Sequence, residues 1–279
     1  MARKPTATQI ATFQALLADA NAAVREVFLA AVYAASDTFT LSSVNAIGAG
    51  PASVTSSIDI RDFYGTGAGQ IPMDHLHASG AASGSNLTAV ANSGGAGAEF
   101  DVAVSGTIPV TPPYVTLDPN NRFDIASRVE LVDTRLFIVA DILALTSNQN
   151  FFGRNVGGEV TNIFLNTAGD RMTVNRNPGT GFVNAQIDLS PAVAAALRLY
   201  EIEMTPGGNI TVWVNGQQRG SVANPFTTFG VNRIAAGQSL TSGLNARLYR
   251  TLYLNQGGDY AARIPIIRSR LNEPYGLGM

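Results

Sequence analysis

The chain has 279 residues, of which 46% are hydrophobic and 14% charged, and its formal net charge is -2. This length is enough for about two domains, and a piece of ~150 residues buries roughly 70% of the surface that its unfolded chain exposes. The low charge supplies no basic field for a phosphate backbone, so we expect no nucleic-acid partner. The absence of cysteine excludes disulfides and cysteine-ligated zinc. Membrane insertion is not expected either, because no run reaches ~20 apolar residues.

Residues 1–37 are predicted to form an N-terminal helix for docking or oligomerisation. Thr6 and Gln9 have the spacing of a capping box. Apolar residues then recur at alternating steps of three and four, as on one helix face: Ile10, Phe13, Leu17, Ala20, Val24, Val27 and Ala31. This stripe fits a helix packed on its own domain and also a seam between subunits. A membrane-surface helix would need more cations on its polar face.

Residues 38–121 are predicted to form an extended arm or small β region rich in Gly, Ser and Ala. Short β-prone pieces alternate with small residues, and the stretch 78–98 has nearly low complexity. Such a segment buries little apolar surface per residue, so it would be flexible alone. We therefore expect it to be held by other copies of the protein, in a closed trimer or a ring, or by an extended path over a surface. The prolines and asparagines of residues 111–121 mark the expected domain boundary.

Residues 122–256 are predicted to form an antiparallel β-sandwich, followed by a C-terminal tail at 257–279. The strongest element is Asn209 to Gly216, where apolar and polar residues alternate before an Asn-Gly hairpin turn. Other strands are expected at 136–143, 160–165, 171–174, 182–189, 199–204 and 246–254, with a short helical turn at 191–197. Regular turns between them favour a mainly β fold of two packed antiparallel sheets over βαβ units.

Three stretches of this half form a recognisable pattern: the paired strands 199–204 and 210–216, then Arg219-Gly-Ser221, and the closing strand 247–254. In kind and order they resemble the concanavalin A-like lectin and glucanase jelly rolls, including laminin G-like domains, over about residues 122–256. The resemblance implies a jelly-roll sandwich. The whole layout of helix, small-residue arm and sandwich also resembles tailed-bacteriophage structural proteins, which implies a place on a virion surface.

Glu201 and Glu203 are the nearest approach to a catalytic pair. Two residues apart on one strand, they share a face with Cα atoms ~6.8 Å apart. Glycoside hydrolases of the resembled fold usually carry Glu-x-Asp-x-x-Glu, whereas this chain reads Glu-Ile-Glu-Met-Thr-Pro. We therefore expect both carboxylates on the solvent side, opposite an inward Tyr200 and its neighbours. No nucleophile elbow, phosphate loop or zinc signature occurs, so we predict no enzyme and no catalytic residues.

Trp213, Tyr249 and Tyr253 are the candidate binding residues. Trp213 alternates with the apolar residues of its strand, and both tyrosines are expected to face away from the leucines of strand 246–254. Exposed rings on a sheet face suit stacking of a sugar or a protein interface. The alternative is that both sheet faces are covered, in which case these rings are simply packed.

His75 and His77 lie two residues apart, which places both imidazoles on one side of an extended chain. In trimeric phage spikes and fibres, such a pair from each of three chains can supply six ligands to one iron. The pattern is short and common, so we expect ordinary surface or hydrogen-bonded histidines, with no metal and no cofactor. Asp170, Asp188 and Asp259 lack the spacing of a calcium loop.

These features predict a non-enzymatic structural protein of a bacteriophage-like particle. It would be assembled in the host cytoplasm and exposed on the virion, as a head decoration, a tail fibre or a tail tip. The expected partners are other copies of the protein, other virion proteins and a host cell-surface glycan. The alternative is a stand-alone carbohydrate-binding or carbohydrate-active protein of the concanavalin A-like fold.

Overall fold

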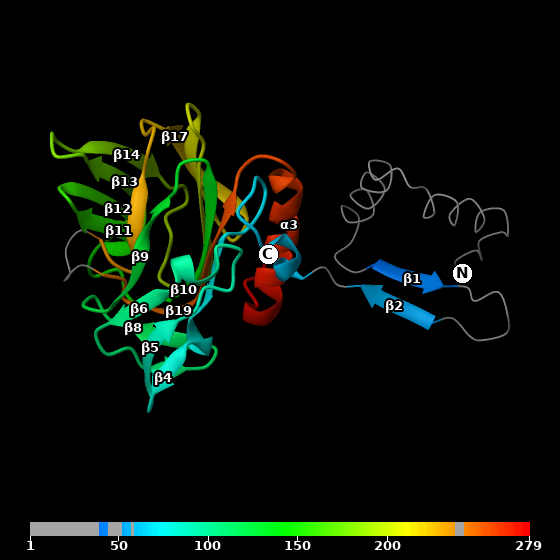
Figure 1. Cartoon of the computed structure of the whole chain (residues 1–279). Helices are drawn as coiled ribbons and strands as arrows, with labels where there is room; N and C mark the ends of the chain where they lie inside the picture. The colour runs from blue at the N-terminus through cyan, green and yellow to red at the C-terminus, as the bar shows by residue number, and fades with distance from the viewer. Residues whose placement is uncertain (1–38, 44–51, 57–58, 238–242) are drawn as a thin grey trace. The chain divides into compact units, whose positions relative to one another are not determined.

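The computed structural model describes residues 39–43, 52–56, 59–237 and 243–279, and the chain divides into two compact units at Asp59. In the first unit the described residues form an antiparallel pair, β1 (Phe39–Ser43) with β2 (Ala52–Ser56). The amphipathic helix predicted within residues 1–37 lies outside the described residues. The second unit, residues 60–279, carries all the remaining described elements (Figure 1).

Two antiparallel sheets build the second unit, as the sequence predicts. One sheet has the order β14 (Val183–Asp188), β13 (Arg171–Asn177), β12 (Glu159–Leu165), β11 (Gln149–Val156), β18 (Gly230–Ile234), β9 (Arg122–Glu130), β6 (Val102–Ser105), β5 (Asn86–Val90) and β4 (Ala81–Ser83). The other has the order β17 (Gln217–Ala223), β16 (Asn209–Val214), β15 (Leu197–Met204), β10 (Thr134–Ile142), β19 (Ala246–Asn255), β8 (Tyr114–Leu117) and β7 (Val110–Thr111), and β3 (Met73–Leu76) also pairs with β19. We call them the nine-stranded and the eight-stranded sheet.

The main hydrophobic core lies between these sheets. Phe123 and Phe151 come from the nine-stranded sheet, and Tyr200 comes from the eight-stranded sheet. The rings of Phe151 and Tyr200 meet with centroids 5.1 Å apart. Each fully buried side chain of this size stabilises the fold by about 1.5–3 kcal/mol relative to exposure. The inner faces expected for strands 199–204 and 210–214 are confirmed, because this core contains Tyr200, Ile202, Met204, Ile210, Val212 and Val214.

A second hydrophobic core lies on the outer face of the eight-stranded sheet. Helix α3 (Tyr260–Tyr275) buries Ile264, Ile267 and Leu271 against residues of β10 and β19 such as Phe137 and Leu252. This helix replaces the C-terminal tail that the sequence was expected to form. Its buried residues are spaced by three and four, which is the helical period. Gly276 ends the helix in the left-handed conformation at φ 61°.

The structure does not separate two units at the boundary expected near Arg122. Strands β3 to β8 precede that residue yet belong to the two sheets, because β6 pairs with β9 and β3 pairs with β19. The short 3₁₀ helices η2 (His77–Ser79) and η3 (Gly97–Phe100) lie between these strands in the chain, and η1 (Ile60–Phe63) precedes them. Strands of the same chain thus hold this small-residue segment. Residues 191–196 are irregular and not a helical turn.

The Asn-Gly hairpin that the sequence predicts joins β16 to β17. Asn215 and Gly216 both have positive φ, 49° and 73°, as a type I′ turn requires. Asn215 also fixes its surroundings: its Oδ1 accepts from the Leu199 amide at 2.9 Å, and its Nδ2 donates to the Leu277 carbonyl at 3.0 Å. The turn therefore anchors the segment that follows α3.

Candidate functional site

The two tyrosines predicted to share a face of β19 lie on opposite faces. The pairing of β10 with β19 shifts between Val139 and Ala140, and Tyr249 is the extra residue of this β-bulge. Tyr249 consequently faces outward, where its ring packs between Tyr114 and Tyr275 under α3. Tyr253 faces inward and belongs to the main core. A bulge reverses the alternation beyond it, so the expectation of one shared face was wrong.

Tyr253 lines a pocket of about 480 Å³ at one end of the sandwich. We call it the β9–β10 pocket, because the connection between these strands forms one wall. The last residues of β19, the loop after η1 and the ring of Phe100 complete it. Its lining residues are Thr66, Gly67, Ala68, Phe100, Arg128, Glu130, Val132, Asp133, Thr134, Tyr253, Asn255 and Gln256.

Hydrogen bonds hold the polar wall of this pocket in place. Asn255 donates through Nδ2 to the carbonyls of Thr66 and Gly67, at 3.0 and 3.2 Å. Gln256 donates through Nε2 to the carbonyl of Thr134 at 3.4 Å, and its amide nitrogen donates to the Asp133 carbonyl at 2.9 Å. Three segments far apart in sequence are thereby fixed around one cavity, which reduces the ordering cost of binding.

The aromatic side of the pocket consists of Phe100 and Tyr253, whose ring centroids are 6.3 Å apart. Tyr253 is only 5% exposed. Burial raises the pKa of its hydroxyl, with a smaller contribution from the charge of Glu99, so this group stays protonated at neutral pH. The pocket therefore combines apolar rings with neutral hydroxyl and amide groups.

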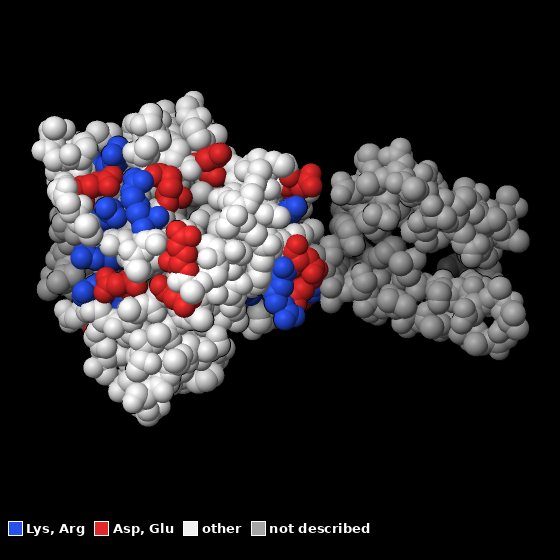
Figure 2. All heavy atoms as spheres, viewed as in Figure 1, with Lys and Arg blue, Asp and Glu red and all other residues white. Residues whose placement is uncertain are grey.

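Arg128 and Glu130 supply the charged side of the pocket. Their side chains form an ion pair with an Nη1 to Oε2 distance of 2.7 Å. Glu130 also accepts hydrogen bonds from the amides of Phe229 and Val132. Basic and acidic side chains are interspersed across this face of the unit, over the region where β9 and β11 to β14 lie (Figure 2). The pocket thus opens beside a charged surface.

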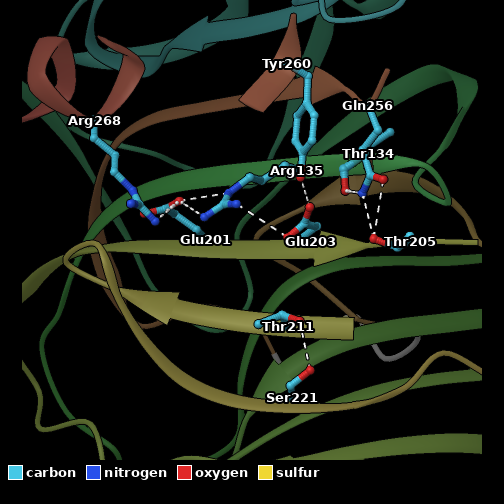
Figure 3. A network of polar contacts seen from close by, with 10 residues as sticks. All are labelled: Thr134, Arg135, Glu201, Glu203, Thr205, Thr211, Ser221, Gln256, Tyr260 and Arg268. Carbon is cyan, nitrogen blue, oxygen red and sulfur yellow. Dashed lines mark hydrogen bonds and ion pairs between the residues drawn. The ribbon is translucent and has the colours of Figure 1, made fainter. Parts of the chain in front are cut away.

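Trp213 is not among the residues that line the pocket. It stacks on Arg135, a member of the polar network on the outer face of the eight-stranded sheet that Figure 3 shows. The guanidinium carbon of Arg135 lies 3.7 Å from the Trp213 ring centroid. Arg135 also donates through Nη2 to Glu201 at 2.7 Å, and Arg268 of α3 donates through Nε to the same carboxylate at 2.8 Å. The Tyr260 hydroxyl, also on α3, donates to Glu203. This network attaches the helix to the sheet.

Glu201 and Glu203 point away from the main core, as predicted, but α3 covers this face and they are not solvated. Glu201 is fully buried, and the side chain of Glu203 is 14% exposed. Burial is the largest cause of a raised pKa at Glu203, and the charge of Arg135 acts against it. Both carboxylates are engaged by side chains of the chain itself. The sequence missed this because the covering helix comes from residues beyond the predicted sandwich.

His75 and His77 are both fully buried. The Nε2 atom of His75 lies 2.8 Å from the carbonyl of Phe100, and that of His77 lies 3.0 Å from the hydroxyl of Thr251. They are hydrogen-bonded histidines, one of the two environments expected, and not surface residues. In the described residues no group of three or more His, Cys, Asp or Glu is placed to hold a metal.

Within the described part of the chain, no helix is long and apolar enough to cross a membrane. No protein-family model and no curated protein matches the sequence.

Several solved structures have a similar fold. One is domain 4 of AbnA, a GH43 extracellular arabinanase from Geobacillus stearothermophilus, in complex with arabinotriose; it matches with a TM-score of 0.53 and 8% identity over 70% of this chain and 97% of that chain. Another is the receptor-binding domain of botulinum neurotoxin mosaic serotype C/D, with a TM-score of 0.50 and 9% identity over 76% of this chain and 52% of that chain. The binding domain of botulinum neurotoxin DC, in complex with SialylT, has a TM-score of 0.50 and 11% identity over the same shares. At these identities the likeness shows the fold alone, a β-sandwich.

Proposed function

We propose that this chain is a non-enzymatic, glycan-binding structural protein displayed on the surface of a bacteriophage-like particle. The observation that carries the glycan-binding part is the β9–β10 pocket, with its two aromatic rings and its fixed rim of amide, hydroxyl and charged groups. A sugar offers hydroxyl groups to such a rim and an apolar C–H face to aromatic rings. The volume of about 480 Å³ lies in the range of small-ligand sites.

The fold supports the same assignment by analogy. Domain 4 of the arabinanase was solved with arabinotriose, and the neurotoxin binding domain with SialylT. Both are β-sandwiches similar to this chain. The analogy covers the general architecture and does not say where a glycan would bind. The pocket is therefore the main support for glycan binding, and the similar structures are consistent with it.

The non-enzymatic part rests on how the paired carboxylates are used. A glycosidase needs one carboxyl group to donate a proton and another to attack or activate water. Glu201 is fully buried and accepts from Arg135 and Arg268, so access to it requires moving α3. Glu203 accepts from Tyr260. This engagement favours a structural role over catalysis.

The particle part rests on the layout of the sequence. The compact unit that carries the pocket begins at Ile60 and follows 59 residues that form a separate unit. A separate N-terminal unit suits attachment to other copies in a trimer or ring, and to other virion proteins, while the sandwich faces outward. Trp213, which is partly exposed, remains a candidate for contacts between subunits in this arrangement, whereas Tyr249 is buried under α3.

A glycan array probed with the full chain tests the binding, and negative-stain imaging with a labelled antibody tests the location. We expect retention of a defined set of glycans, and antibody on the surface of particles. The stand-alone alternative predicts glycan binding by a free monomer with no particle. Release of reducing sugar from a retained glycan would overturn the non-enzymatic assignment, and an array without any retained glycan would overturn glycan binding.

A further inference from the structure

Arginine is concentrated on the charged surface beside the β9–β10 pocket. Three arginines of the nine-stranded sheet meet two carboxylates in one series of ion pairs. The arginines are Arg128, Arg154 and Arg176, and the acids are Glu130 and Glu159. We call this group the arginine cluster. It has an excess of positive charge, although the whole chain has a formal net charge of -2.

The excess of arginine over carboxylate is clearest around Glu159. It lies 2.9 Å from Arg176, 3.3 Å from Arg154 and 3.7 Å from Arg128, measured between the nearest charged atoms. One carboxylate has two oxygens and pairs fully with one guanidinium in the bidentate geometry. Three guanidinium groups around it therefore retain donors that it does not satisfy. The Nε of Arg154, the atom that lies 3.3 Å from Glu159, is buried and makes no hydrogen bond with the described residues.

These arginines are reachable from solvent. The side chain of Arg128 is 36% exposed, that of Arg176 is 25% exposed and that of Arg154 is 16% exposed. Arg128 connects the cluster to the pocket, because it lines the pocket and also lies beside Glu159. The other charged residues that line the pocket are both acidic: Glu130, which pairs with Arg128, and Asp133, which lies in the β9–β10 connection. Arg128 is thus the cationic edge of the cavity.

We propose that the ligand of the β9–β10 pocket is an acidic glycan, whose carboxylate groups bind the arginine cluster while one sugar ring occupies the pocket. This inference rests on the proposed glycan-binding function. A guanidinium group matches a carboxylate in shape and offers two parallel donors. A polymer with an acid on successive sugars would extend from Arg128 across Arg154 and Arg176. Such a ligand would compete with Glu159 for these arginines.

The test compares matched acidic and neutral probes on the full chain. The probes are trigalacturonic acid and its methyl ester, and sialyllactose and lactose, titrated at about 50 and 200 mM salt. We expect at least one acidic probe to bind about tenfold more tightly than its neutral partner, with the difference reduced at higher salt. Equal affinity for both members of each pair would overturn the inference and leave glycan binding intact. Binding of none of the probes, together with an empty glycan array, would overturn both.

Three variants separate a binding role of the cluster from a structural one. Arg176→Gln removes one cluster charge and leaves Glu159 two arginines, so acidic-probe affinity should fall about fivefold. Arg171→Gln is the matched control, because Arg171 begins the same strand and pairs with Asp188 outside the cluster; it should bind as the parent does. Glu159→Gln removes the internal competitor and should raise acidic-probe affinity about fivefold.

The Glu159→Gln variant distinguishes a binding role of the cluster from a structural role most clearly. A purely structural ion-pair cluster predicts weaker or unchanged binding in this variant, and that result would overturn the inference. A duplex DNA of about 20 base pairs serves as the polyanion control. Tighter binding of the DNA than of every acidic glycan would also overturn it, because the cluster would then be a phosphate-backbone site.

Discussion

Arg135 stacks on Trp213 while it holds the buried carboxylate of Glu201, and this stacking connects the chain's one tryptophan to the docking of α3. The aromatic ring covers one side of the guanidinium, and Arg268 approaches Glu201 from the helix. Burial lowers the pKa of Arg135, and its pairing with Glu201 acts in the opposite direction. The two partners therefore offset the cost of holding this charge away from water.

Replacement of the tryptophan should weaken the fold more than ligand binding. Trp213→Ala removes the cation–π contact and exposes Arg135, so we expect the free energy of unfolding to fall by about 2 kcal/mol. Trp213→Phe keeps a ring and should lose about half as much. Urea unfolding followed by circular dichroism measures this loss. A variant that keeps its stability but no longer binds glycan would show that Trp213 belongs to the binding site.

Neutralising the buried carboxylate should have a large effect. Glu201→Gln leaves Arg135 and Arg268 without their shared anion, at an expected loss of about 3 kcal/mol. The control is Glu273→Gln, since Glu273 is 54% exposed and pairs with Arg270 on the surface of α3; its loss should stay below about 0.5 kcal/mol. Equal unfolding midpoints for the two variants would contradict the docking role of Glu201.

The boundary of the folding unit can be tested by truncation. A fragment of residues 60–279 keeps every strand of both sheets and α3, so we expect cooperative unfolding. A fragment of residues 122–279 loses β3 to β8, including the partners of β9 and β19, and should not fold. Thermal unfolding by circular dichroism distinguishes them. A cooperative transition in the shorter fragment would restore the domain boundary expected from the sequence.

The buried histidine pair should make stability sensitive to acid. Burial lowers the pKa of His77 well below 6.5, with a smaller effect of His75, and burial also lowers the pKa of His75 against the charges of Asp74 and Asp101. The folded state therefore binds fewer protons than the unfolded state below about pH 6.5. Stability from this source is complete above that pH and is lost as the pH falls, by up to about 1.4 kcal/mol per pH unit for each histidine.

Trp213 fluorescence in urea at pH 7.5 and 5.5 measures this dependence. A variant with His75→Gln and His77→Gln is the control, because it retains the carboxylates and loses both imidazoles. We expect the difference in unfolding free energy between the two pH values to be smaller in the variant. The same difference in both proteins would assign the acid sensitivity to the carboxylates instead.

The sequence predicts those parts of the fold that depend on local alternation. Strand β10 reads as apolar on both faces, and the structure gives the reason, because α3 covers the outer face. The Asn215-Gly216 turn is also predictable from the local sequence, because both of its residues have positive φ, which few residue types other than Gly and Asn adopt readily. Features that depend on distant pairing were not predictable. The bulge at Tyr249 is defined by the register with β10, and no residue of β19 signals it.

The candidate site was only partly visible in the sequence. Tyr253 was singled out as an aromatic residue, and it does line the pocket, although from the inner face. Asn255 and Gln256 carry no pattern that marks a site, because their role comes from contacts with Thr66 and Thr134, which are far away in the chain. The three-and-four spacing of Ile264, Ile267 and Leu271 could have revealed α3, but Pro265 and Pro274 weaken the helical signal.

The most direct test of the β9–β10 pocket as the glycan site is to measure glycan binding by a variant in which a bulky side chain fills the pocket. Thr66 is exposed on the pocket wall, and its backbone carbonyl accepts from Asn255, so Thr66→Trp adds bulk without removing that bond. Thr107→Trp is the matched control, because Thr107 is also exposed and its carbonyl accepts from Asn121 outside the pocket. With the best array ligand measured by calorimetry, we expect Thr66→Trp to lose at least about tenfold in affinity, and Thr107→Trp to bind as the parent does. Unchanged affinity in a folded Thr66→Trp variant would contradict the assignment of the β9–β10 pocket as the glycan site.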